Sequence, residues 1–79
     1  MTTITAYIGL YSRQIYLDGV KSFTGHNGTP AIPTEYHGVV KKYAVDKFYD
    51  FQIINALNNN YITQEEYDDT LTYGTPKTP

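Results

Sequence analysis

The sequence predicts a small α+β domain in which an N-terminal β-hairpin or strand pair precedes a long helix and a short, capped C-terminal helix. Three observations lead to this prediction. Apolar residues alternate with polar or small ones near the N-terminus, an Asp-Gly pair follows, and a helical repeat of apolar residues begins after Pro33. Strands bury every second residue, whereas helices bury every third or fourth. An all-α protein of three helices is the alternative fold.

Residues 4–11 fit both periods. Alternation predicts a strand that buries Ile4, Ala6, Ile8 and Leu10. A helical stripe instead joins Ile4, Tyr7, Ile8, Tyr11 and Ile15. Isoleucine, threonine and tyrosine are strand formers, so their propensity favours the strand.

The next segment supports a hairpin. Asp18-Gly19 separates two β-prone runs within residues 14–23, and both positions tolerate the positive φ of a two-residue turn. In the competing interpretation, Gly19 is the C-cap of an N-terminal helix. That interpretation leads to the all-α fold.

A loop and then a long helix are predicted in the middle of the chain. Residues 24–33 contain two glycines, two prolines and the pair Asn27-Gly28, which rules out a long regular element. From Thr34, a candidate N-cap, an apolar face recurs at about 100° per residue until residues 58–60, three asparagines, end the helix. This face holds Tyr36, Val40, Tyr43, Ala44, Phe48, Phe51 and Ile54.

The last helix has the clearest local signals. Thr63 and Glu66 have the spacing of a capping box, so a helix should begin at Gln64 and continue to Tyr73. Tyr67 and Leu71 are one turn apart and are expected to face inward. We therefore expect one domain over residues 1–73 and a flexible or partner-ordered tail over residues 74–79.

Size and composition indicate a protein that depends on partners. A chain of 79 residues without cysteine has a thin core and cannot gain stability from disulfides or thiolate metal sites. Oligomerisation or docking onto a larger assembly is the remaining route. The nine tyrosines suit interfaces, because a tyrosine combines a large apolar area with a polar tip.

The charge distribution argues against nucleic-acid or membrane binding. The net charge is −2, with a sum of +2 over residues 1–44 and −4 over residues 45–79. A chain with this asymmetry can stack head to tail with copies of itself, although an ordinary solvated acidic helix explains the same charges. Neither a signal peptide nor an apolar run of about 20 residues is present, so a soluble protein made in a reducing cytoplasm is expected.

No pattern predicts catalysis, a cofactor or a metal site. Ser12 and Ser22 lie outside any nucleophile elbow, and the two histidines, His26 and His37, are read as loop and helix-start residues. Neighbouring acids such as Asp68 and Asp69 diverge on a helix instead of converging on one ion. The expected class is therefore a non-enzymatic protein.

Two segments resemble small proteins of tailed bacteriophages. Pro30-Ala-Ile-Pro-Thr-Glu-Tyr-His37, which continues into residues 39–49, resembles head-to-tail adaptor and neck proteins, in which such a turn opens a helix. Residues 54–67, which end in Ile-Thr-Gln-Glu-Glu-Tyr, are similar to the end of XkdX-type tail-region proteins. Together the two segments cover about the C-terminal half of the chain.

The resemblance implies a structural component of a phage particle, at the head–tail junction or in the tail. Such a protein would be made in the host cytoplasm, would occur in several copies in the virion and would contact other phage structural proteins. A small phage-encoded inhibitor of a host protein is the alternative. Because the arms 24–33 and 74–79 lack a periodic apolar face, we expect their neighbourhoods to supply the partner contacts, with Ile32, Tyr36 and Tyr73 as candidates.

Overall fold

The computed structural model describes residues 4–25 and 28–78, and every regular element in this part of the chain is a helix. The predicted α+β fold, with its N-terminal hairpin or strand pair, is therefore wrong, and the all-α alternative fits. The described residues form four α-helices, one more than that alternative expected. In chain order the elements are α1 (Thr5–Arg13), the π-helical turn η1 (Gln14–Asp18), the 3-10 turn η3 (Thr34–Tyr36), α2 (His37–Lys47), α3 (Asp50–Asn58) and α4 (Gln64–Leu71).

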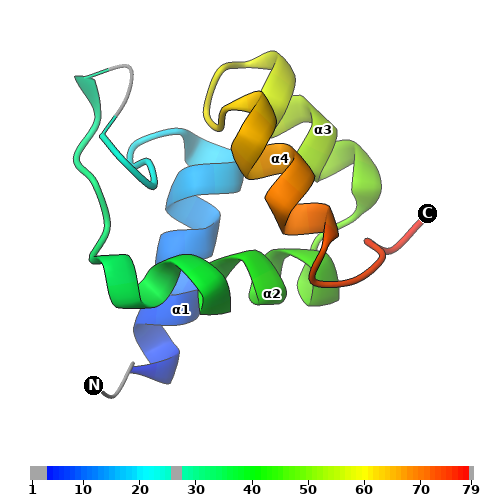
Figure 1. Cartoon of the computed structure of the whole chain (residues 1–79), viewed down its shortest axis with the longest axis horizontal. Helices are drawn as coiled ribbons and strands as arrows, with labels where there is room; N and C mark the ends of the chain where they lie inside the picture. The colour runs from blue at the N-terminus through cyan, green and yellow to red at the C-terminus, as the bar shows by residue number, and fades with distance from the viewer. Residues whose placement is uncertain (1–3, 26–27, 79) are drawn as a thin grey trace.

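The helices pack around one apolar core (Figure 1). α2 contacts both α1 and α4, while α3 packs against η1 and α4. The buried side chains of α4, Glu66 and Thr70, are polar. The core residues are Ile15, Tyr16, Phe23, Ile32, Tyr36, Val40, Ala44, Val45, Phe48, Ile53, Ala56 and Ile62.

Burial in α1 and η1 follows the helical period, which explains why the strand prediction fails. A strand would place Ile4 and Leu10 on the same buried face as Ile8, yet both are exposed. The expected β-propensity is outweighed because one helical face packs against α2 and α3. That face consists of Ile8, Tyr11, Ser12, Ile15 and Tyr16, at positions i, i+3, i+4, i+7 and i+8.

The Asp18-Gly19 pair ends a helix instead of turning a hairpin. Gly19 has a φ of 68°, the left-handed conformation that closes many helices. Its N–H donates to the carbonyl of Gln14, which also accepts from the N–H of Val20 at 3.0 Å. A Cβ at position 19 would overlap the ring of Tyr61, so the position needs glycine for its conformation and for its lack of volume. The competing interpretation of Gly19 as a C-cap is confirmed.

The predicted long helix is two helices, because the chain is extended at Phe48 and Tyr49, with ψ angles of 155° and 158°. An unbroken helix over residues 34–57 would be about 36 Å long. The whole molecule extends only 32 Å along its longest axis. The break turns α3 back, so that Ile53 is fully buried. It also shifts the apolar repeat, and Phe51, predicted on the buried face, is 46% exposed.

The last helix begins where the sequence predicts. Thr63 Oγ1 accepts a hydrogen bond from the Glu66 N–H at 3.2 Å, and Glu66 Oε1 accepts one from the Thr63 N–H at 2.9 Å. The capping box is therefore confirmed. The expectation that Leu71 faces inward is wrong, since this side chain is 37% exposed while the neighbouring Thr70 is fully buried.

Thr70 is buried because it completes a hydrogen-bond chain with Tyr16. Its Oγ1 lies 2.7 Å from the Glu66 carbonyl oxygen, which can only accept, and 2.7 Å from the Tyr16 hydroxyl. Thr70 therefore donates to the carbonyl, and Tyr16 donates to Thr70. Burial raises the pKa of the Tyr16 phenol well above its ordinary value, so this hydroxyl keeps its proton. The chain ties η1 to α4 through the core.

Isolated backbone pairings fix the two irregular segments. Ser22 donates its N–H to the Pro30 carbonyl and accepts from the Ile32 N–H, each at 3.0 Å. In the segment predicted as a tail, the Lys77 carbonyl accepts from the Asp50 N–H at 2.7 Å. Each pairing is a single parallel bridge outside any strand. The loop and the described part of the tail are therefore anchored to the helical core of their own chain.

The hydrogen-bond chain predicts a non-additive pair of substitutions. Tyr16→Phe should lower the free energy of unfolding by about 1–2 kcal/mol, and Thr70→Val, which leaves the tyrosine hydroxyl buried without its acceptor, by about 1–3 kcal/mol. The double variant should lose less than the sum, since neither hydroxyl is then left unpaired. Urea unfolding followed by circular dichroism measures all three values, and strict additivity would contradict the chain.

The exposure of Leu71 predicts a small effect of truncating it. Leu71→Ala should lower the free energy of unfolding by less than about 1 kcal/mol. Ile53→Ala, at a fully buried position of α3, is the matched comparison and should cost about 2–5 kcal/mol. Thermal unfolding of both variants checks the difference, and equal effects would show that Leu71 contributes to the core.

Candidate functional site

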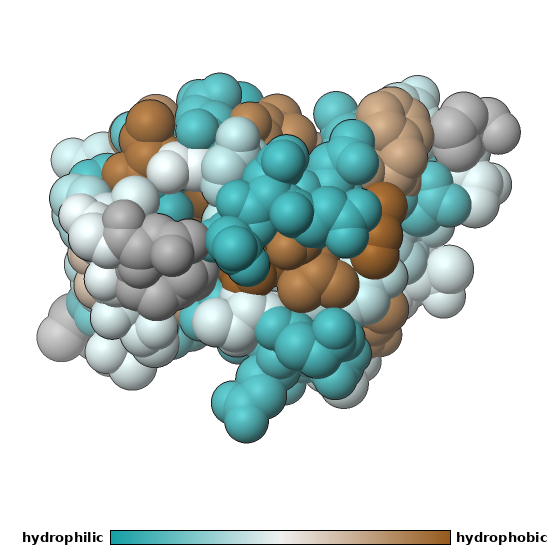
Figure 2. All heavy atoms as spheres, turned by 90° about the horizontal axis from the view of Figure 1, so that it is seen from above, coloured by the Kyte–Doolittle hydropathy of each residue, from teal (hydrophilic) through white to brown (hydrophobic). Residues whose placement is uncertain are grey.

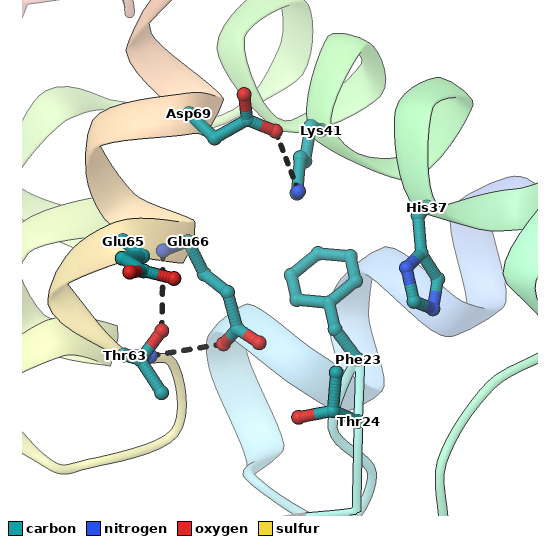
Figure 3. A pocket seen from close by; sticks show the side chains of 8 residues that line it. All are labelled: Phe23, Thr24, His37, Lys41, Thr63, Glu65, Glu66 and Asp69. Carbon is teal, nitrogen blue, oxygen red and sulfur yellow. Dashed lines mark hydrogen bonds and ion pairs between the residues drawn. The ribbon is translucent and has the colours of Figure 1, made fainter.

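A cleft of about 500 Å³ opens between α2, α4 and residues 23–24 (Figure 3). The ring of Phe23 lies at its centre, with Lys41 and His37 on the α2 side and three carboxylates on the α4 side. The cleft is lined by Phe23, Thr24, His37, Lys41, Thr63, Glu65, Glu66 and Asp69.

Lys41 connects the two sides of this cleft. Its Nζ lies 2.6 Å from Asp69 Oδ2 and 4.9 Å from the centroid of the Phe23 ring. The lysine side chain is only 12% exposed, so its aliphatic part is packed while its ammonium group meets a carboxylate and an aromatic face. The His37 and Phe23 rings form a T-shaped pair, with the centroids 5.3 Å apart. Lys41 thereby holds α2 against α4.

The acids of α4 have separate partners, as the sequence predicts for neighbouring carboxylates. Glu66 belongs to the capping box, Asp69 pairs with Lys41, and Asp68 accepts a hydrogen bond from Gln64 Nε2 at 2.9 Å. Glu65 is exposed. In the part of the chain that the structure describes, no group of three or more histidine and acidic side chains is placed to hold a metal ion.

The two serine hydroxyls are taken up by hydrogen bonds to the backbone of their own chain. Ser12 Oγ donates to the Ile8 carbonyl at 2.6 Å, and Ser22 Oγ accepts from the Gly25 N–H at 2.7 Å. Both serines are buried, so their hydroxyls have structural roles. His37 Nε2 is buried, and over residues 4–25 and 28–78 it finds no hydrogen-bond partner. His26 lies outside the described residues.

The three side chains predicted as partner contacts pack against residues of their own chain. Ile32 and Tyr36 are buried core residues. The Tyr36 hydroxyl accepts from the Ile4 N–H at 2.9 Å, and its ring meets that of Tyr11 edge-on at 5.0 Å. Tyr73 is half-buried against the core. The described part of the chain therefore presents its exposed apolar area elsewhere.

Two surfaces carry that exposed apolar area. We call the first the α1 stripe, which consists of the exposed side chains of Tyr7, Leu10 and Leu17 in α1 and η1. The second is the α3–α4 groove, a hollow of about 290 Å³ lined by Asp50, Phe51, Ile54 and Tyr67. At its end Phe51 stacks on the exposed Tyr49, with centroids 5.6 Å apart and ring planes 10° apart.

The figures show the setting of the groove. α3 and α4 lie together at the upper right of Figure 1. Figure 2 looks down on this end of the molecule, where apolar atoms reach the surface among hydrophilic ones. Sequence reasoning missed the groove because it treated Phe51 as part of a continuous helical face.

Comparisons with protein families, with curated proteins and with solved structures find no match to this chain. None of the helices in the described residues has the length and apolar character needed to cross a membrane.

The contacts of Lys41 predict that the two adjacent lysines of α2, Lys41 and Lys42, differ in their effect on stability. Lys41→Ala removes an ion pair and a cation–π contact and should lower the free energy of unfolding by about 1–2 kcal/mol. Lys42→Ala is the matched control, because its pair with Asp46 is exposed on both sides and should contribute about 0.5 kcal/mol or less. Chemical unfolding at low and high salt checks this, and equal losses would remove the role assigned to Lys41.

Proposed function

We propose that the protein is a non-enzymatic structural component of a tailed bacteriophage particle, at the head–tail junction or in the tail, and that it works through protein–protein contacts. The particle follows from the resemblance of residues 30–49 and 54–67 to phage adaptor, neck and tail-region proteins. The mode of action follows from the exposed apolar side chains. We propose that these side chains are covered by neighbouring virion subunits.

The single observation that carries the proposal is the clustering of exposed apolar residues. Eight large apolar side chains are exposed in the described part of the chain, and most of them belong to the α1 stripe or lie at the α3–α4 groove. Single exposed apolar residues are normal on any protein, whereas clustered ones mark contact sites. Aromatic residues such as Tyr49 and Phe51 are also the type that interfaces favour.

The alternative proposal is a small phage-encoded inhibitor of a host protein. One observation favours it, namely that Asp50, Glu65 and Asp68 are exposed and form no ion pair among the residues that the structure describes. An acidic surface of this kind suits binding to a basic host protein. The apolar clusters favour the structural proposal, because they offer contact area that a purely electrostatic inhibitor does not need.

Mass spectrometry of purified particles tests the proposal. We expect the protein in particles in several copies, and we expect phage lacking it to produce heads and tails that fail to join or tails that fail to form. His37→Ala should leave assembly intact, because His37 lines the other cleft and belongs to neither apolar surface. The protein's absence from particles, together with its recovery bound to a host protein during infection, would replace the structural proposal with the inhibitor.

A further inference from the structure

The cleft between α2 and α4 carries more negative charge than its own side chains neutralise. Three carboxylates line it, those of Glu65, Glu66 and Asp69, while Lys41 supplies the single lysine or arginine cation among the described lining residues. This lysine is already paired with Asp69 at 2.6 Å. In the part of the chain that the structure describes, no ion pair involves Glu65 or Glu66. Two carboxylates of the cleft are therefore left without a cation.

Glu66 distinguishes this cleft from an ordinary acidic surface. Its side chain is only 8% exposed, and its Oε1 accepts the Thr63 N–H at 2.9 Å in the capping box. No other hydrogen bond to this carboxylate is made within residues 4–25 and 28–78, yet Oε2 is not sealed from solvent. Figure 3 shows this second oxygen turned away from Thr63 and toward Phe23. The buried carboxylate thus offers one free acceptor to the cleft.

A buried carboxylate without a cation is costly, because it has lost water that would otherwise solvate its charge. The Thr63 N–H and the positive end of α4 offset part of this cost and hold the Glu66 side chain in place. Phe23, which is 2% exposed, forms the apolar floor beside it. Such surroundings strengthen electrostatic attraction, so a cation gains more at Glu66 than at an exposed carboxylate.

A guanidinium group suits this cleft better than an ammonium group does. The volume of about 500 Å³ lies within the range of small-ligand sites, which is about 300–1,000 Å³, so a planar group and its stem can enter together. Guanidinium is more weakly hydrated than ammonium and loses less solvation on entering. It also carries several N–H donors, which can serve Glu66, the exposed Glu65 carboxylate and the exposed Thr24 hydroxyl.

We propose that the cleft between α2 and α4 binds a guanidinium group, with Glu66 Oε2 as the main acceptor and the Glu65 carboxylate as a second one at the rim. The group belongs either to a free small molecule or to an arginine side chain of a partner protein. The site shares no lining residue with the α3–α4 groove, so it goes beyond the apolar contacts on which the proposed function relies.

Titration of the purified, ¹⁵N-labelled chain, followed by NMR, tests the site with three probes. Arginine blocked at both ends as N-acetyl-arginine N-methylamide represents a side chain of a protein, and agmatine represents a free small molecule. The equally blocked citrulline has nearly the same shape without the charge. We expect saturable shifts of the Thr24 and Glu66 amide signals with guanidinium probes and none with citrulline.

The tighter of the two guanidinium probes assigns the source of the group. Tighter binding of blocked arginine supports a partner protein, and tighter binding of agmatine supports a free small molecule. Absence of saturable shifts with both of these probes would overturn the proposal, and so would equal binding of blocked citrulline. These outcomes are measured on the wild-type chain, so they do not depend on any variant being folded.

Glu66→Gln tests the assigned acceptor. Glutamine keeps the size of the side chain and also serves in a capping box, so this variant removes the charge with little change to the helix start. It should weaken the binding of blocked arginine by about tenfold or more. Asp68→Asn is the matched control, because it removes the same charge from α4 at a position that does not line the cleft.

We expect Asp68→Asn to bind blocked arginine as tightly as the wild type, within about twofold. Circular dichroism confirms that both variants are folded. Unchanged binding in Glu66→Gln would overturn the assigned acceptor, and an equal loss in Asp68→Asn would show a general attraction to the acidic helix in place of a site. The measurements use purified protein, so they are independent of whether the chain occurs in particles.

Discussion

Two consecutive hydrogen bonds in the core, from Tyr16 to Thr70 and from Thr70 to the Glu66 carbonyl, hold together segments that are far apart in the chain. Tyr16 and Thr70 are 54 residues apart in sequence. The Tyr16 ring also meets Phe23 and Phe48, each with its centroid 6.0 Å away. Four segments therefore meet around the Tyr16 side chain. They are the N-terminal helical segment, the following loop, the break between α2 and α3, and α4. Because a buried hydroxyl without a partner is costly, this arrangement requires Thr70 inside, and that turns Leu71 outward.

The small size of the domain explains why two of its surfaces expose apolar side chains. Four short helices bury one face each, and the molecule extends only 19 Å along its thinnest axis. There is too little volume to cover the second apolar side of α1 or the outer side of α3. The α1 stripe and the α3–α4 groove are therefore direct results of the fold. In the proposed particle, neighbouring subunits cover these surfaces, and the thin core of the domain becomes part of a larger packed structure.

Local signals in the sequence were sufficient where one interaction decides the structure. Thr63 and Glu66 fix the start of α4, and the asparagines at residues 58–60 end α3. Local sequence patterns failed to predict the structure where packing against distant segments determines it. Residues 4–11 satisfy two periods at once, and only the neighbours of Ile8 select the helix. The break at Phe48 carries no glycine or proline, so the groove that depends on it lay beyond sequence reasoning, as did the burial of Ile32.

The single backbone pairings at Ser22 and Lys77 have a consequence for how this sequence can diverge. A main-chain hydrogen bond does not depend on the identity of the side chain, provided that the donor residue is not proline. Positions 30 and 77 only accept, and position 30 already holds proline. Positions 22, 32 and 50 donate and must retain an N–H. Related chains are thus free to change the side chains at positions 30, 50 and 77 while keeping these pairings, whereas Ile32 is constrained twice, by its N–H and by its place in the core.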